Sequence, residues 1–225
     1  MRIIAVLVFV MALAGCKGGQ TTASVELETD EQKTFYALGM AVSQPLYPFS
    51  LSEEEMAYVQ AGLADGVMKR EARVDMDTFG PKIEELARVR VEQTVTQAKA
   101  AGSEFMKKAE AEPGATKTAS GVVVKVLTEG TGEKPTELDT VKVHYHGTLA
   151  DGTVFDRSVE RDEPVTIPLG NVIKCWVEGV QEIKVGGKSR LVCPPETAYG
   201  DRGSAPRIPP GATLAFEVEL LEIVK

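Results

Sequence analysis

Residues 143–158, VHYHGTLADGTVFDRS, hold the clearest structural pattern in this sequence. Apolar and polar side chains alternate at its start, which places Val143 and Tyr145 on one face of a predicted β-strand and His144 on the other. Asp151-Gly152 then predicts a hairpin turn. The stretch therefore indicates antiparallel β-structure with one buried face.

Aromatic side chains recur in this stretch and in three later segments, VIKCWVEGV (172–180), AYGD (198–201) and IPPGATLAF (208–216). The segments also contain Gly, Asp and Pro, which favour turns. Aromatic rings collected among turn residues predict a shallow apolar pocket with few polar groups. This pattern indicates binding of something apolar, and not acid/base or metal chemistry. Five of the chain's thirteen aromatic residues belong to the set: Tyr145, Phe155, Trp176, Tyr199 and Phe216.

The composition argues against several other functions. The formal net charge is −8 and no cluster of Lys and Arg stands out, so binding to a nucleic-acid backbone is not expected. Only two histidines occur, His144 and His146, two apart on the polar strand face. They could bind a metal together, but no third ligand is evident, and we expect neither a metal nor a cofactor.

The N-terminus has the pattern of a targeting segment. An apolar run of eleven residues, Ile3–Leu13, is too short to span a bilayer, which needs about 20 residues, but it suits a secretory signal. It ends in Leu13-Ala14-Gly15-Cys16, which resembles a bacterial lipobox. We therefore expect a signal peptide over 1–15, a lipid-acylated Cys16 and a flexible tether over 16–29. An ordinary signal peptide with a chance cysteine is the alternative.

The residue after Cys16 bears on location. By analogy with enterobacterial sorting, Lys17 in place of aspartate suggests the outer membrane, with the protein facing the periplasm.

Once Cys16 is assigned to the lipid, Cys175 and Cys193 remain as an even pair in an oxidising compartment. Strand alternation over 188–193 places Cys193 on the inward face with Leu191. Cys175 precedes Trp176, which we place in the pocket floor. A disulfide between the two cysteines is our hypothesis, and two buried free thiols are the alternative.

Residues 30–112 show helical periodicity, with apolar residues three or four apart. A first helix is expected to end near Pro45 or Pro48, and Ser52-Glu53-Glu54-Glu55 predicts a capping box that opens a second. A third helix begins between Asp75 and Pro81 and runs to about Glu110. The apolar positions of the first two helices are Phe35, Leu38, Val42 and Leu46, and then Met56, Val59, Leu63 and Val67.

The third helix is long and mostly polar, with a thin apolar stripe. A segment of this kind needs tertiary packing to be stable. Either the helices pack on the C-terminal half, or two copies of the chain pair by exchanging helices. A helix of about 45 Å would project beyond a small neighbouring domain, so we expect a homodimer.

After Pro113 the pattern changes to period two. Strands are expected over 121–127, 141–145, 164–167, 188–193 and 212–223, with one helix over 176–183. Several antiparallel strands and one short helix predict an α+β domain over 113–225. It follows a helical domain over 30–112.

The C-terminal motifs resemble the FKBP-type peptidyl-prolyl cis-trans isomerases. The resemblance runs from VHYHGTLADGTVFDRS through VIKCWVEGVQEIKVGGKSRLVCPPETAYGDRG to IPPGATLAFEVELL. It implies an antiparallel sheet wrapped on one short helix. The helical half, with KTFYALGMAVSQPL and a long connecting helix, is similar to the N-terminal dimerisation domain of Mip-like bacterial FKBPs.

The resemblance also implies the site. It places the Trp176 indole under a substrate proline ring, and it assigns an amide donor to Ile173 and a hydroxyl donor to Tyr199. Asp156 would lie near the twisting amide, although it could instead cap a turn with Arg157 or Arg161. The residues assigned to catalysis are Tyr145, Phe155, Asp156, Tyr199 and Phe216, and those assigned to substrate binding are Val165, Val172, Ile173, Trp176 and Ile208.

Four positions depart from the commonest family pattern. Val165 stands where a wall residue is often aromatic, Cys175 replaces the usual Gly before the tryptophan, and Ser204 and Arg207 alter the loop over the pocket. The departures affect the expected substrate preference. They also affect the expected affinity for macrolide inhibitors such as FK506 or rapamycin.

The implied reaction is rotation about an X–Pro bond, whose resonance barrier is about 18–20 kcal/mol. No bond is made or broken, so an apolar pocket that favours the twisted amide can suffice. We expect the substrates to be proline-containing unfolded or nascent envelope proteins. A non-catalytic chaperone or binding lipoprotein that uses the same pocket and a helical cleft is the alternative function.

Overall fold

The computed structural model describes residues 25–158 and 163–224. The expected signal peptide, Cys16 and most of the expected tether lie outside these residues. The described chain divides into two compact units, one ending at Val42 and the other beginning at Ser43. The first unit holds the helix α1 (Asp30–Ser43), whose last residue crosses the division, and the second unit holds the other elements.

The first helix ends earlier than expected. α1 stops at Ser43, and Leu46, which we had placed in its apolar stripe, lies in the 3₁₀ helix η1 (Gln44–Phe49). Proline explains the change, because Pro45 has no N–H to donate and disfavours the α-conformation of the residue before it. Pro48, inside η1, prevents a return to α-helix over the same segment.

The second helix opens at the expected cap, and the third begins within the expected range. α2 (Glu53–Val67) opens with the predicted capping box, in which the Ser52 hydroxyl accepts from the Glu55 amide and the Glu55 carboxylate accepts from the Ser52 amide. α3 (Met76–Glu110) is capped by Asp75, whose side chain accepts from the Asp77 amide. Because the cap lies at Asp75, Pro81 falls in the second turn of α3 and not in its first.

An ion pair ties η1 and α2 to α3. Arg90 of α3 donates to Glu55 Oε1 at 2.5 Å and to the Phe49 carbonyl at 3.3 Å. The hydrogen bond from Arg90, with help from the Ser52 amide, lowers the pKa of Glu55 to about 2. Glu55 therefore serves both the cap of α2 and the contact of α2 with α3.

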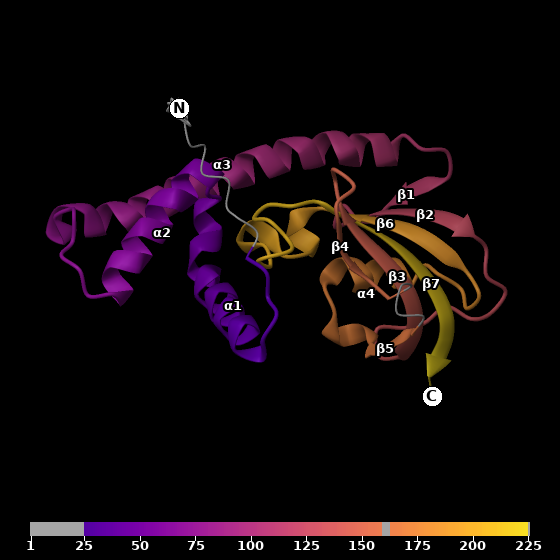
Figure 1. Ribbon diagram of the computed structural model, residues 1–225. Helices are drawn as coiled ribbons and strands as arrows, with labels where there is room; N and C mark the ends of the chain where they lie inside the picture. The colour runs from indigo at the N-terminus through magenta and orange to yellow at the C-terminus, as the bar shows by residue number, and fades with distance from the viewer. Residues whose placement is uncertain (1–24, 159–162, 225) are drawn as a thin grey trace, which may run out of the picture. The chain divides into compact units, whose positions relative to one another are not determined.

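The C-terminal half forms one antiparallel sheet, in the order β1-β2-β6-β7-β3-β4, with β5 also paired to β3 (Figure 1). The expected strands are present, and the structure adds two that the sequence reading had missed, β1 and β4. The strands are β1 (Ala115–Lys117), β2 (Val123–Thr128), β3 (Thr140–Leu149), β4 (Val154–Arg157), β5 (Val165–Pro168), β6 (Lys188–Cys193) and β7 (Leu214–Val224).

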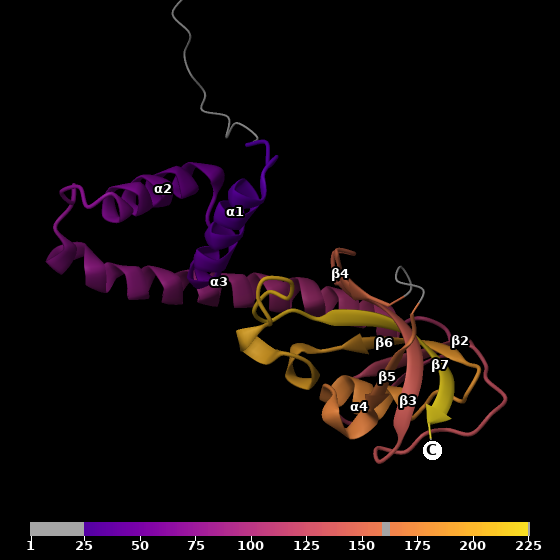
Figure 2. The ribbon, with the colours of Figure 1, turned by 60° about the horizontal axis from the view of Figure 1, so that its bottom comes forward.

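The sheet buries one face in the main core and part of the other face against α3. On one face, Leu214, Phe216 and Val218 of β7 pack with the short helix α4 (Lys174–Val180) in the main core. On the other face, Ala215 packs with Ala109 at the end of α3, because successive strand residues point to opposite sides. The short α4 and the C-terminal end of α3 thus cover opposite faces of the sheet (Figure 2).

Close backbone packing joins α3 to the sheet domain. A Cβ on Gly102 would lie 2.2 Å from Thr213 Oγ1, so only glycine allows this approach. Glu112, just after the helix, accepts from Lys125 of β2 at 2.6 Å and also from Arg190 of β6. We had considered that the helices pack on the C-terminal half. The last turns of α3 do so.

Other apolar side chains of the helices are not covered in this single chain. α1 has no buried residue, and Phe35 is 65% exposed. Apolar side chains gathered in this number on exposed helices are unusual for a monomeric soluble protein. The exposed large apolar residues of α1, α2 and α3 are Phe35, Tyr36, Leu38, Met40, Val42, Tyr58, Leu63, Val67, Met76, Phe79, Ile83 and Leu86.

Candidate functional site

Four aromatic rings meet at one end of the main core. The ring centroids of Trp176 and Phe216 lie 5.4 Å apart, those of Trp176 and Tyr145 5.3 Å apart, and those of Phe155 and Phe216 5.5 Å apart. All three pairs are edge-to-face, the arrangement that suits the charge distribution of aromatic rings. The structure therefore brings together four of the five aromatic residues that the sequence singled out.

One carboxylate faces this cluster. The Tyr145 hydroxyl donates to Asp156 Oδ2 at 2.6 Å, and Asp156 Oδ1 accepts from the Arg157 amide at 2.9 Å. Asp156 and Arg157 both lie in the strand β4 (Val154–Arg157), so this contact is not the turn cap that we had considered for Asp156. Arg161, the other partner considered, lies outside the described residues.

Gly147 makes the ring contacts possible, and the sequence reading had missed it. Gly147 of β3 pairs with Asp156 of β4 on one side and with Phe216 of β7 on the other. A Cβ at this position would lie 2.7 Å from the Phe155 ring and 3.1 Å from the Phe216 ring. A glycine inside a predicted strand, as in HYHGTL, is the signal that could have found it.

The helix α4 carries Trp176, and a disulfide holds the start of this helix. Cys175 and Cys193 of β6 are fully buried and bonded to each other, with their Cα atoms 5.6 Å apart. Trp176 is 5% exposed, and among the described residues its indole nitrogen has no hydrogen-bond partner. The floor of the candidate pocket thus presents an apolar ring with an N–H that is not engaged.

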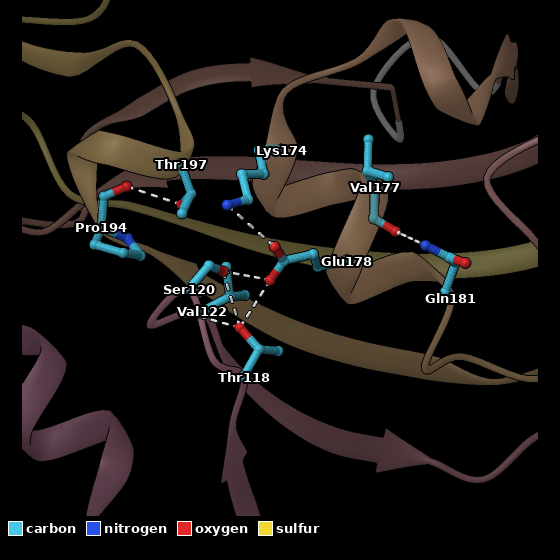
Figure 3. A network of polar contacts seen from close by, with 9 residues as sticks. All are labelled: Thr118, Ser120, Val122, Lys174, Val177, Glu178, Gln181, Pro194 and Thr197. Carbon is cyan, nitrogen blue, oxygen red and sulfur yellow. Dashed lines mark hydrogen bonds and ion pairs between the residues drawn. The ribbon is translucent and has the colours of Figure 1, made fainter.

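A polar network holds the opposite side of α4 (Figure 3). The Glu178 carboxylate accepts from the Thr118 hydroxyl at 2.8 Å and from the Ser120 hydroxyl, and it lies 3.7 Å from Lys174 Nζ. Partial burial would raise the pKa of Glu178, but the hydrogen bonds from Ser120 and Thr118 outweigh it and lower the pKa. The sequence reading had given no role to this carboxylate.

The loop between β6 and β7 carries the last two site residues. Ile208 is 5% exposed and belongs to the main core, whereas Tyr199 is 40% exposed. Ser204 and Ile208 exchange both backbone hydrogen bonds, at 2.8 and 2.9 Å. Asp201 of the same loop pairs with Lys99 of α3 at 2.6 Å, so α3 supports the loop as well as the sheet.

The other assigned residues lie around the same core. Val172 and Ile173 pack against it, and the Ile173 carbonyl accepts the first amides of α4, from Trp176 at 2.9 Å and from Val177 at 3.2 Å. Val165 pairs with Val143 at the start of β5 and is partly buried. Val172 and Ile173 therefore lie against the core just before α4, whereas Val165 is placed only by its pairing with Val143.

Two further observations concern the described residues only. They contain no group of three or more His, Cys, Asp or Glu side chains that could hold a metal ion. None of their helices combines the length and the apolar character that a bilayer crossing requires. His144, which we had considered as a metal ligand, lies instead within hydrogen-bonding distance of Ser158, at 3.2 Å.

Comparison with known proteins now identifies the family. The family described as "FKBP-type peptidyl-prolyl cis-trans isomerase" matches residues 131–221, and the "domain amino terminal to FKBP-type peptidyl-prolyl isomerase" matches residues 31–126. The FKBP-type isomerase FkpA of Escherichia coli K12 is 38% identical over 209 residues, which cover 87% of this chain and 77% of FkpA. The chain belongs to the FKBP-type peptidyl-prolyl cis-trans isomerases.

A relative of known structure and a relative that matches only part of the chain agree with this assignment. The crystal structure of FkpA from E. coli covers 88% of this FKBP-type isomerase and 98% of its own chain, with a TM-score of 0.65 and 35% identity. FK506-binding protein 1 of Rhizopus delemar is 53% identical over 106 residues, which are 46% of this chain and 98% of that protein. The predicted family, fold class and enzyme class of this FKBP-type isomerase are thus confirmed.

Proposed function

We propose that the four-ring cluster, with Asp156, Ile208 and Tyr199, is the pocket in which this isomerase rotates X–Pro bonds. The observation that carries the proposal is the packing of Tyr145 and Phe216 edge to face on the Trp176 ring, which gathers three aromatic side chains at one place in the core. A proline ring is apolar and compact, and the Trp176 indole offers it a flat surface. The exposed Tyr199 and the amide of Ile173 supply donors for the substrate backbone.

The proposed mechanism is desolvation without covalent chemistry. A planar amide has a large resonance dipole that water solvates well, and the twisted amide has lost part of it. An apolar pocket therefore disfavours the planar state more than the twisted one. A thousandfold acceleration needs only about 4 kcal/mol of differential stabilisation. Asp156, already held by Tyr145, contributes a fixed negative charge beside the rotating bond.

The pocket assignment is tested by cis-to-trans relaxation of a short X–Pro peptide. Phe155→Ala and Asp156→Ala should lower kcat/KM and leave the oligomeric state unchanged. Leu138→Ala is the control, since Leu138 is exposed and lies outside both the pocket and the helical half. Wild-type turnover in both pocket variants would overturn the assignment.

The proposal includes a homodimer formed by the helical half. The apolar side chains left exposed on α1, α2 and the first half of α3 support it, since burial of such surface drives association. A fragment from Val95 onward keeps the contacts of Lys99, Gly102 and Ala109 with the sheet domain. Light scattering should show a monomer for this fragment and a dimer for the chain from Val25.

The proposed location is the bacterial cell envelope, with a lipid on Cys16 that anchors the protein to the outer membrane. The lipobox-like Leu13-Ala14-Gly15-Cys16 supports the anchor, and the Cys175–Cys193 disulfide fits an oxidising compartment. Mass spectrometry of the mature N-terminus tests the acylation. A Cys16→Ala variant should release the protein from the membrane fraction.

A second candidate function, holding unfolded chains, has its own supporting observation. Within the unit from Ser43 onward, a groove of about 640 Å³ lies between η1, α2, α3 and the loop at 201–210. Its walls are mostly apolar, with Leu46, Pro48 and Met56 facing Pro206 and Ile208. The groove would offer an unfolded client apolar contacts beyond the proline pocket.

The two functions separate experimentally. Phe155→Ala should abolish most isomerisation, whereas Met56→Ser alters the groove alone. If Phe155→Ala keeps full suppression of aggregation of a reduced, unfolded protein and Met56→Ser loses it, the groove acts as the holding site. Wild-type suppression in Met56→Ser would count against the groove.

A further inference from the structure

We infer that Glu178 is a positioning residue for the isomerase: it locks the rotation of α4, and with it the Trp176 indole, against the turn between β1 and β2. The inference rests on the proposed pocket, because it matters for catalysis only if Trp176 contacts the proline ring. Glu178 itself contacts neither the rings nor, in the proposed site, the substrate.

The turn that receives Glu178 is itself closed by hydrogen bonds. The Thr118 amide donates to the Val122 carbonyl at 2.9 Å, and the Gly121 amide donates to the Thr118 carbonyl at 3.0 Å. The Thr118 hydroxyl also accepts from the Val122 amide at 3.2 Å. Thr118 and Ser120 therefore present their hydroxyls from a fixed frame.

The hydroxyls hold Glu178 more firmly than its ion pair does. Lys174 is 62% exposed and lies 3.7 Å away, so water screens this pair. The Glu178 side chain is only 27% exposed, and both hydroxyl hydrogen bonds converge on Oε2 (Figure 3). An ionised carboxylate accepts and cannot donate, which matches two O–H donors.

A helix as short as α4 needs such a support. Seven residues make about two turns, which do not form a stable helix alone. The disulfide at Cys175 and the close approach of Gly179 to Leu191, where a Cβ would lie 2.7 Å from Leu191 Cδ1, fix one side of α4 to β6. None of these contacts holds the face of α4 that carries Glu178.

Glu178 supplies contacts that hold α4 on a second side. Residues two apart on a helix point about 200° away from each other, so Glu178 faces outward while Trp176 faces the rings. Loss of the Glu178 contacts would let α4 roll and would move the indole relative to Tyr145 and Phe216. The proline surface would then lose its orientation while the core stays packed.

The chain contains one tryptophan, so its fluorescence reports on Trp176 alone. We expect Glu178→Leu to shift the emission and to lower kcat/KM about tenfold, mainly through a raised KM. Glu178→Gln keeps an acceptor oxygen and should recover most of both readouts. Thr118→Val combined with Ser120→Ala should give the same emission shift and the same loss of kcat/KM as Glu178→Leu. The variant that carries all three substitutions should show no further loss of kcat/KM.

Glu182→Leu is the matched control, because Glu182 follows α4 and pairs on the surface with Lys134 at 2.8 Å. This control should keep wild-type emission and kcat/KM. If the Glu178 and Thr118/Ser120 variants also keep both, the inference is wrong. If Glu178→Leu does not fold, the two single hydroxyl variants decide the outcome in the same way. Absence of isomerisation by the wild-type protein would overturn the proposed pocket, whereas the emission shift would still test the positioning.

Discussion

The Tyr145 hydroxyl donates a hydrogen bond to Asp156 Oδ2 at 2.6 Å, across the paired strands β3 and β4. The aromatic wall of the proposed pocket and the Asp156 carboxylate are therefore one unit. The Arg157 amide holds the other carboxylate oxygen, so the position of Asp156 is fixed before a substrate binds.

Tyr145→Phe tests this unit, because it removes the hydroxyl and keeps the ring. A hydrogen bond to a charged group contributes about 1.5–3 kcal/mol, so we expect kcat/KM for an X–Pro peptide to fall at least tenfold. The unfolding midpoint should also fall, because the same hydrogen bond contributes to folding stability, although the ring still packs against Trp176. Tyr58→Phe on exposed α2 is the control, and equal turnover in the two variants would show that the Tyr145 hydroxyl has no catalytic consequence.

The disulfide should stabilise the isomerase domain. Cys175 and Cys193 are 18 residues apart, and a cross-link that closes a loop of this length contributes about 3 kcal/mol. The Cys175→Ala/Cys193→Ala variant should lose that amount of unfolding free energy in urea. A thiol titration of the denatured wild type should find reactive thiols at these positions only after reduction, and free thiols beforehand would contradict the bond.

The lowered pKa of Glu55 predicts that the stability of the helical half depends on pH. Its pKa is lowered from 4.5 to about 2 by Arg90 and the Ser52 amide, so it binds a proton less readily when folded. The stabilisation is present above pH 4.5 and is lost as the pH falls toward 2. The helical melting temperature of Glu55→Gln, followed by circular dichroism, should be lower than wild type at pH 7, and most of this difference should be gone near pH 2, where Glu55 is half protonated. Glu54→Gln should follow the wild type throughout, and a wild-type advantage as large at pH 2 as at pH 7 would refute the assignment.

Two glycine substitutions should have opposite effects. Gly102→Ala would push a methyl group against Thr213, so we expect a loss of about 1–3 kcal/mol in unfolding free energy. A Cβ added at Gly62 in α2 would meet no neighbouring atom within 4 Å. Gly62→Ala should therefore raise the unfolding free energy by up to about 1 kcal/mol, because alanine has the higher helix propensity. Chemical denaturation measures both, and equal stability in the two variants would mean that α3 does not approach the sheet as described.

Several features could be predicted from the sequence because their physical causes are local. Alternation placed Leu191 and Cys193 on the inward face of β6, and both lie in the main core. The Ser52–Glu55 capping box was visible because both of its hydrogen bonds join residues three apart. The family could be named because its motifs run in order through most of the C-terminal half.

Other local predictions failed at the edges of elements. The four residues of β4 had no alternation long enough to detect, and η1 arose where Pro45 and Pro48 interrupt a helical apolar stripe. Gly147 went unnoticed because its importance depends on Phe155 and Phe216, which come from two other strands. A glycine in a strand signals a close approach but does not say to what.

Local sequence patterns determined most of the helices and strands and the aromatic residues of the proposed pocket, because periodicity and turn chemistry act within a few residues. The tertiary structure decided which distant partners meet. It joined Cys175 to Cys193, placed Glu178 beneath two hydroxyls 58 and 60 residues earlier, and laid α3 on the back of the sheet. Hydrogen bonds and packing between residues far apart in the chain depend on how the whole sheet closes, and no short stretch of sequence contains that information.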